Sequence, residues 1–208
     1  MTIEARLADG LAAMGITLDA AAQAKLLAYV RLIEKWNKVH NLTAVRDPGQ
    51  MVALHILDSL SVLAHVAGAR TLLDVGSGAG LPGIPLAIAR PDLAVTLLDA
   101  SHKKATFLRQ AKAELALANV EVACERVEKW HPAAPFDIVV SRAFAELAEF
   151  VEQAGHLVAR DGTMLAMKGV NPIDEIARLP SSHRVGNVVE LRVPSLDAKR
   201  HLVFLRAA

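Results

Sequence analysis

The residues best placed to do chemistry are a run of glycines and an acidic residue one strand further along the chain. Residues 72–80 read Leu-Leu-Asp-Val-Gly-Ser-Gly-Ala-Gly, and Asp99 ends the next apolar run. Gly76 and Gly78 carry no Cβ, so the backbone can approach a ligand closely. In a doubly wound sheet, an acidic residue at the end of the following strand can bind the hydroxyls of a ribose. The pattern therefore predicts a site for a cofactor that contains adenosine.

Two cofactor classes compete for this turn. The stretch Gly78-Ala-Gly-Leu-Pro-Gly83, with Asp99 at a suitable distance, matches the dinucleotide fingerprint and favours NAD. Asp74, however, precedes the glycines and would repel a pyrophosphate, whereas it suits the ammonium and sulfonium of S-adenosylmethionine. Pro82 and Pro85 also remove backbone N–H donors from the segment that follows. We favour S-adenosylmethionine over NAD, and both over a turn that binds nothing.

Arg142 follows the apolar run 136–141, so we expect it at the carboxyl end of a strand, where ligands bind in such sheets. The alternative is a surface arginine paired with a carboxylate. The chain lacks the Asn- or Asp-Pro-Pro-aromatic stretch typical of enzymes that methylate exocyclic amines. Cys124 lies in no nucleophile motif and is expected to be inert core. A methyl acceptor that needs neither deprotonation nor covalent activation fits best. N7 of guanine is such an acceptor, and catalysis would then rest on positioning and desolvation.

Several polar residues allow both a structural and a functional interpretation. His55 and Asp58 are one helical turn apart, which predicts an ion pair or hydrogen bond between them. Asn41 suits the end of a helix, and it is also a candidate for substrate contact, as is Lys168 after the fifth predicted strand. Basic residues that could line one rim of the crevice and contact RNA phosphates are Arg31, Lys35, Lys38, Arg46, Lys103, Lys104, Arg109, Lys168 and Arg200.

Composition limits the class of protein. The chain has 208 residues, 53% of them hydrophobic, and a net charge of +1, so any nucleic-acid site must be a local patch. One cysteine excludes an intramolecular disulfide framework and fits a reducing cytosol. The sequence has no secretory leader, no uninterrupted apolar run that could span a bilayer, and no cluster with metal-ligand spacing. We expect a cytoplasmic monomer without a metal.

The pattern of elements changes near residue 69. Residues 1–68 read as a helical extension, with a helix from Thr17 or Asp19 to about His40 and another that begins at Asp47-Pro48. Residues 69–208 alternate strands and helices, which predicts a mostly parallel α/β sheet. The predicted strands are 71–75, 94–99, 120–124, 136–141, 162–168, 184–192 and 201–206. The predicted helices are 83–90, 102–117 and 145–158. The last two strands would form an antiparallel hairpin at the sheet edge, as in the Rossmann-like class I methyltransferase fold.

Seven stretches resemble the RsmG family, also called GidB, of bacterial methyltransferases of 16S ribosomal RNA. They run nearly end to end, and the first, third and fifth together are specific. They are Trp36–Pro48, His55–Leu60, Asp74–Leu86, Leu98–Lys104, Ser141–Ala143, Lys168-Gly169 and Arg200–Val203.

The resemblance implies transfer of a methyl group from S-adenosylmethionine to N7 of a guanosine in 16S RNA of the small subunit. It also implies that Gly76, Leu81, Val127, Glu128 and Arg142 line the cofactor. The reasoning from residues alone adds Gly78 and Asp99.

Two alternatives stay open. An NAD-dependent oxidoreductase would bind a nicotinamide cofactor, and Asp74 and the lack of a visible hydride-transfer residue speak against it. A non-catalytic ribosome-assembly factor would bind RNA without methyl transfer, but it would have no need of the glycine turn.

Overall fold

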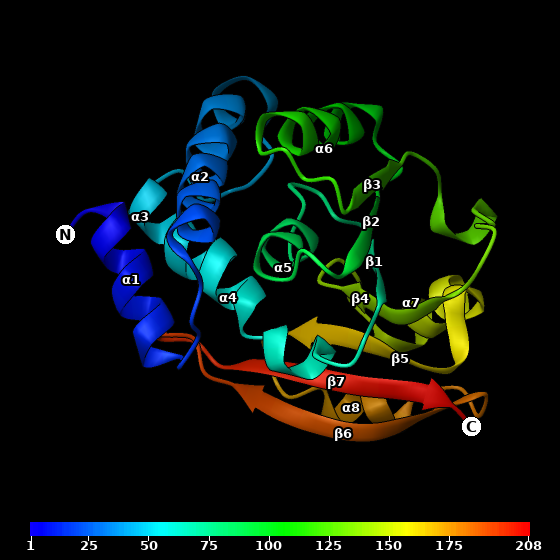
Figure 1. Ribbon diagram of the computed structural model, residues 1–208. Coiled ribbons are helices and arrows are strands. Elements are labelled where there is room, and N and C mark those ends of the chain that lie inside the picture. Colours follow the sequence, from blue (N-terminus) through cyan, green and yellow to red (C-terminus); the bar gives the residue numbers. More distant parts are fainter.

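A seven-stranded sheet in the order β3-β2-β1-β4-β5-β7-β6 organises the computed structural model, which describes residues 1–208 (Figure 1). The first five strands are parallel, and β7 runs antiparallel to both β5 and β6. The predicted α/β sheet with an antiparallel edge hairpin is therefore confirmed. The strands are β1 (Thr71–Val75), β2 (Ala94–Leu98), β3 (Val120–Ala123), β4 (Phe136–Ser141), β5 (Val158–Lys168), β6 (His183–Leu191) and β7 (Arg200–Ala207).

The chain order reverses between β1 and β4. From β1 the chain moves outward through β2 to β3, and it then returns to place β4 on the other side of β1. Ligands of open α/β sheets bind at such a switch point, outside the carboxyl ends of the strands. The topology therefore directs attention to the turns that follow β1 and β4.

The N-terminal segment is helical, as predicted. It contains α1 (Ile3–Ala13), α2 (Ala20–His40), α3 (Pro48–Met51), the π-helical segment η1 (Val52–Leu57), α4 (Asp58–Leu60) and the 3₁₀ segment η2 (Leu63–Val66). Asp19 caps the start of α2 by accepting from Ala22 N at 2.7 Å, and Asn41 ends it in the left-handed conformation at φ 47°. Asp47 caps the next helix by accepting from Gln50 N at 2.8 Å, which confirms the predicted start at Asp47-Pro48.

Helices cover both faces of the sheet. On one face lie α5 (Gly83–Ala89) and α6 (His102–Glu114). The helices α2 and α4 pack against these two, and α1 and α3 pack against α2 and η1 (Figure 1). On the other lie η3 (Val127–Lys129), α7 (Leu147–Ala154), η4 (Gly155–Leu157) and α8 (Ile173–Ala177). The larger core joins side chains of the N-terminal helices, such as Leu26 and Ile33, to Ile84 and Phe107 of the α/β part. Residues 1–68 thus share one continuous core with the sheet.

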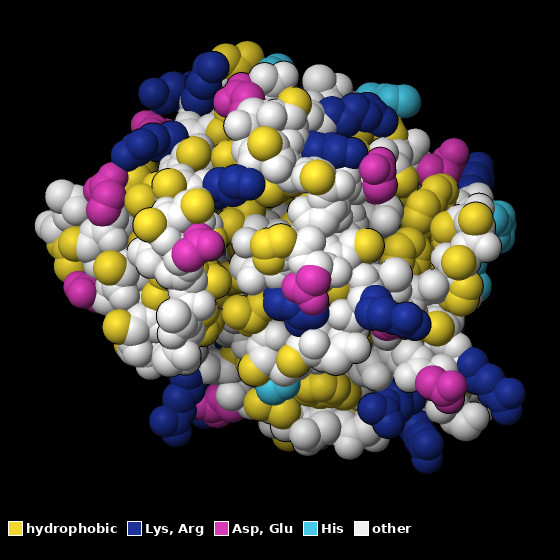
Figure 2. All heavy atoms as spheres, viewed as in Figure 1, with side chains coloured by type: hydrophobic (Ala, Val, Ile, Leu, Met, Phe, Trp, Pro, Cys, Tyr) yellow, Lys and Arg dark blue, Asp and Glu magenta, His cyan; other side chains and the backbone are white.

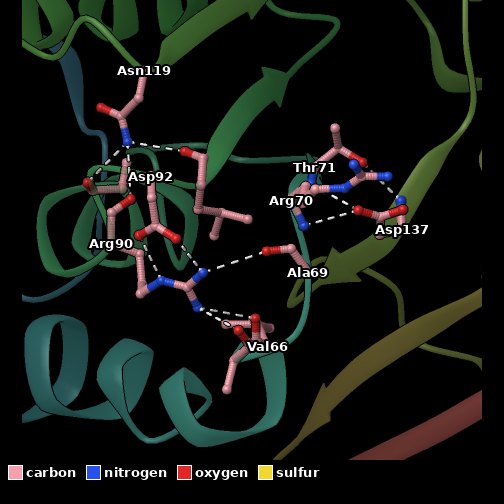
Figure 3. A network of polar contacts seen from close by, with 11 residues as sticks. Val66, Ala69, Arg70, Thr71, Arg90, Asp92, Asn119 and Asp137 are labelled. Carbon is pink, nitrogen blue, oxygen red and sulfur yellow. Dashed lines mark hydrogen bonds and ion pairs between the residues drawn. The ribbon is translucent and has the colours of Figure 1, made fainter.

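Polar contacts fasten the amino-terminal edge of the sheet, away from the switch point (Figure 3). Arg90 pairs with Asp92 at 2.6 Å and donates to carbonyls of the turn before β1. The Asn119 amide donates to the carbonyls of three residues at the end of α5 and the turn after it. Asp137 accepts from the backbone N–H groups of Arg70 and Thr71 at 2.8 and 3.0 Å. These bonds tie the starts of β1 and β4 and the turns beside them together by satisfying exposed and partly buried backbone groups.

Some predicted boundaries were wrong. β5 begins at Val158 rather than at 162, because its first residues extend the pairing with β4 past a bulge. The helix after β4 spans only Leu147–Ala154, and α8 was not predicted at all. One helical stretch, Pro48–Val66, is long and apolar enough to cross a membrane by composition, but 61% of its most apolar window is buried within the fold.

Candidate active site

The turn after β1 passes close to the segment that follows β4. Gly76 has φ +69°, and a Cβ placed on it would lie 2.7 Å from the Ala143 Cβ. The N–H groups of Gly76 and Ser77 both donate to Leu98 O at the end of β2, at 2.8 and 3.1 Å. From the other side, the hydroxyl of the buried Tyr29 on α2 donates to the carbonyl of Ala79. The turn is therefore held from both sides, and only glycine fits at its narrowest point.

A cleft of about 470 Å³ opens on one side of Gly76. Its volume lies within the range typical of small-molecule sites. Asp99, only 6% exposed, accepts from Gly78 N and Ser101 N at 2.9 Å each, and Lys104 Nζ lies 3.7 Å from its carboxylate. The residues that line this first cleft include Val75, Gly76, Leu98, Asp99, Lys104, Val127, Glu128, Ala143 and Phe144.

A smaller cleft of about 190 Å³ opens on the other side of Gly76. The N-terminal helices contribute to its wall, so it exists only because they pack on the sheet. It shares Gly76 and Ala143 with the first cleft, so the two spaces meet across the narrow turn. Its lining residues are Leu42, Thr43, His55, Gly76, Ser77, Gly78, Ala79, Leu81, Arg142 and Ala143.

His55 and Thr43 form a neutral pair in the second cleft. His55 Nε2 lies 2.9 Å from Thr43 Oγ1, and burial lowers the pKa of His55 to about 4. Asn37, which is 3% exposed, fixes the loop that carries Thr43 by accepting from Thr43 N at 3.0 Å and donating to Val45 O at 3.1 Å. Asn37 therefore has a structural role in this loop. The predicted contact between His55 and Asp58 is wrong, because each has other partners.

Arg142 follows the carboxyl end of β4, as expected, and it also pairs with a carboxylate. It lines the second cleft, and its Nη1 lies 2.9 Å from Asp58 Oδ2. The other carboxylate oxygen of Asp58 binds Arg200 Nε at 3.0 Å. Burial raises the pKa of Asp58, and the two guanidinium groups oppose that effect. Reasoning from sequence missed this arrangement, because the partners of Asp58 lie 84 and 142 residues away.

Asp74 does not line either cleft, which corrects the expectation that it faces a cationic ligand. Its side chain is fully buried below the turn, and Oδ2 accepts from Gly83 N at 2.8 Å at the start of α5. Its Oδ1 has no hydrogen-bond partner. Burial raises the pKa of Asp74 to about 7. The carboxyl group therefore contacts the start of α5 and does not line either cleft.

The surroundings of Lys168, Asn41 and Cys124 could not be predicted from the sequence. Lys168 is only 10% exposed and binds Glu175 at 2.7 Å and the carbonyl of Ala145 at 2.6 Å, so it does not present its charge to a phosphate. Asn41 is exposed and accepts from Arg46 Nη2 at 3.4 Å. Cys124 is half-buried, with Sγ 3.4 Å from Nδ1 of His102, so the expectation of a buried core thiol was wrong.

Most of the proposed RNA-contacting residues lie on the surface. Figure 2 shows Lys and Arg side chains over α2 and α6, interleaved with acidic ones. Arg31 pairs with Glu4 at 2.7 Å and Lys38 with Glu34 at 3.6 Å, and these exposed pairs are weak. Arg200 differs, because Asp58 already binds it. The exposed members are Arg31, Lys35, Lys38, Arg46, Lys103 and Arg109.

The residues around the turn after β1 and the first cleft fit a cofactor that contains adenosine. A ribose needs an acidic neighbour at the end of β2, and Asp99 lies there at the edge of the first cleft. A long ligand also has to pass the turn after β1, and Gly76 leaves the space that a Cβ would fill. No group of three or more His, Cys, Asp or Glu side chains is arranged to hold a metal ion.

Sequence comparison finds close relatives over the whole chain. Residues 22–203 match the family model described as GidB, rRNA small subunit methyltransferase G. The ribosomal RNA small subunit methyltransferase G of Nitrosospira multiformis is 55% identical over 98% of this chain and 97% of that protein. The protein of the same name from Methylobacillus flagellatus is 57% identical over 99% of this chain and 98% of its own length.

Structural comparison finds the same fold in more distant proteins. The O-methyltransferase TomG from Streptomyces achromogenes, solved in complex with SAM, superposes with a TM-score of 0.61 and is 17% identical. The match covers 100% of this chain and 99% of that one. At this identity the likeness concerns the fold, which is the Rossmann-like fold of class I methyltransferases.

Proposed function

Because the chain belongs to the rRNA small subunit methyltransferase G family, we propose that it transfers a methyl group from S-adenosylmethionine to N7 of a guanosine in 16S ribosomal RNA. The observation that carries the proposal is the pair of clefts that meet at Gly76 and Ala143, at the switch point of the sheet. The first cleft can hold the adenosine end of a cofactor, while the second can hold its methionine end and admit the group that receives the methyl. We propose that the enzyme acts in the cytoplasm as a monomer.

The first cleft suits the adenosine end of the cofactor. Asp99 can accept hydrogen bonds from the ribose hydroxyls, since each of its oxygens has a further lone pair beyond its bonds to Gly78 and Ser101. Val127 and Glu128 line the same cleft and would contact the adenine. Gly76, Gly78, Leu81 and Arg142 line the second cleft and would hold the methionine end.

The second cleft suits a reaction without a general base. When bound, S-adenosylmethionine supplies an electrophilic methyl group on its sulfonium. N7 of guanine carries a free lone pair, so no side chain has to remove a proton. The low pKa of His55 keeps its imidazole uncharged near neutral pH, so it does not repel a cationic group. The chain's contribution is then to position the two reactants and to exclude water.

The substrate test is transfer of labelled methyl from S-adenosylmethionine to small ribosomal subunits from cells that lack this protein. We expect one 7-methylguanosine in the 16S RNA, identified by mass spectrometry of RNA digests. Free 16S RNA and assembly intermediates are tested beside intact subunits. Cofactor binding without transfer to any of these would support the non-catalytic assembly factor, whereas binding of NAD instead would support the oxidoreductase.

The exposed lysines of α2 give a separate test of the RNA surface. Replacing Lys35 and Lys38 together by Gln should weaken RNA binding and lower its salt slope by about two, at somewhat less than one unit for each phosphate contact. Filter binding at several salt concentrations measures the slope. Arg184 and Arg206, exposed on the distant β6–β7 hairpin, provide the control pair. An unchanged slope in the lysine variant would remove α2 from the RNA interface.

A further inference from the structure

Asp58 joins three segments that are far apart in the sequence. It begins α4, while Arg142 follows β4 and Arg200 begins β7. Each carboxylate oxygen takes one guanidinium group, at 2.9 Å from Arg142 and 3.0 Å from Arg200. The carboxylate is 3% exposed, so both contacts are made out of water. A buried carboxylate with two charged partners constrains the orientation of both.

The contacts of Arg142 leave part of its guanidinium free toward the second cleft. Nη1 donates to Asp58 and, at 3.4 Å, to Leu54 O, and the Nε and Nη2 groups have no protein partner. The side chain is 27% exposed and lines the cleft. A guanidinium fixed along one side can offer its remaining N–H donors to a carboxylate in a forked arrangement.

We propose that Asp58 is a positioning residue for cofactor binding, which holds Arg142 so that its free N–H donors bind the carboxylate of the methionine end of S-adenosylmethionine. This inference rests on the proposed function and adds a residue outside both clefts to it. Arg200 completes the arrangement from the far side of the carboxylate. Arg142 and Arg200 are the charged groups that act on Asp58, and together they oppose the rise in its pKa that burial causes.

The experiment is a double-mutant cycle on cofactor affinity, measured by calorimetry with S-adenosylmethionine. Asp58→Asn and Arg142→Ala should each weaken binding by about tenfold to a hundredfold, the range for a lost hydrogen bond to a charged group. If Asp58 acts through Arg142, the double variant should bind no more weakly than Arg142→Ala alone. The KM for cofactor should rise in Asp58→Asn while the KM for RNA stays unchanged. Additive losses would overturn the inference.

A control variant tests the loss of an exposed aspartate–arginine pair that lies away from both clefts. Asp92→Asn makes the same substitution in an aspartate paired with Arg90 at the other edge of the sheet (Figure 3). It should bind the cofactor as the wild type does. Thermal unfolding of every variant shows whether each is folded at the temperature of the titration.

Arg200 supplies a second route if Asp58→Asn does not fold. In Arg200→Gln, Asp58 keeps one cationic partner, so its pKa should rise and its hold on Arg142 should weaken in acid. As the solution is acidified, cofactor affinity should therefore begin to fall at a higher pH than in the wild type, and Arg200→Lys should restore the wild-type profile. A wild-type profile in Arg200→Gln would contradict the inference. A wild-type protein that does not bind S-adenosylmethionine would instead refute the proposed function itself.

Discussion

Gly76→Arg should bind no measurable S-adenosylmethionine while it keeps its fold. Gly76 has φ +69°, where a residue with a Cβ costs about 1–2 kcal/mol, and its Cβ would lie 2.7 Å from that of Ala143. The long side chain has only the two clefts to enter, because they meet at this residue. The strain is smaller than the stability of a typical domain, about 5–15 kcal/mol, so the chain should still fold. Calorimetric titration with the cofactor measures the loss.

Two further variants identify the cause. Gly68→Arg places the same side chain on an exposed turn where a Cβ meets nothing within 4 Å, so its affinity should match the wild type. Gly76→Ala introduces the strained Cβ without filling the clefts, so it should weaken binding less than the arginine does. Unchanged affinity in Gly76→Arg would show that the cofactor binds elsewhere.

The elements that sequence predicted well are those with strong local signals. β1 and β4 were predicted at their observed bounds, because each is a short apolar run that ends at a turn or at the cleft. Helix ends were predicted at Thr17 or Asp19, at Asn41 and at Asp47, and Asp19, Asn41 and Asp47 are the observed caps, because a cap depends on residues only a few positions away. α8 was missed because it has five residues and no side-chain cap at its start.

Side-chain partners could be predicted only where they lie close in sequence or follow from topology. Arg142 and Asp99 were placed correctly because the carboxyl ends of parallel strands meet at one edge. The predicted contact of His55 with Asp58 assumed an α-helix, whereas His55 lies in the π-helical segment Val52–Leu57 and bonds to Thr43. The partners of Asp58 follow β4 and begin β7, 84 and 142 residues away in the sequence, and no local pattern indicates them. Lys168 was placed at a strand end correctly, but nothing in the sequence marks its pairing with Glu175.

Asp74 illustrates a further limit, because its position was predicted but the direction of its side chain was not. β1 is buried on both faces, as central parallel strands are, so alternation along it does not indicate which side chains reach a cleft. The carboxyl group turns toward the start of α5 and lies wholly out of water. A buried carboxyl group with one unpartnered oxygen is costly when ionised, so this residue should affect stability more than any other single group at the site.

Asp74→Asn should be more stable than the wild type at about pH 8 and equally stable near pH 4. The pKa of Asp74 is about 7 in the folded protein, against 3.8 for an ordinary aspartate, so the folded state binds the proton more tightly than the unfolded state does. The free energy of unfolding of the wild type therefore falls by an amount on the order of 4 kcal/mol as pH rises from about 4 to about 7. Asparagine has no charge to bury, and its carbonyl oxygen can still accept from Gly83 N.

Urea unfolding at a series of pH values measures the difference between variant and wild type. His55, whose pKa is lowered to about 4, acts in the opposite sense in both proteins, so its effect cancels in that difference. Asp137→Asn is the control, with an expected effect of opposite sign. Backbone hydrogen bonds lower the pKa of Asp137, so the ionised carboxylate stabilises the fold at pH values above its pKa in the unfolded chain. The variant should lose that stability. A difference between Asp74→Asn and wild type that does not change with pH would contradict the raised pKa. The cofactor affinity of Asp74→Asn is measured as well. Weak binding by this stabilised variant would mean that the protein keeps the aspartate for cofactor binding at the site after β1, at a cost in stability.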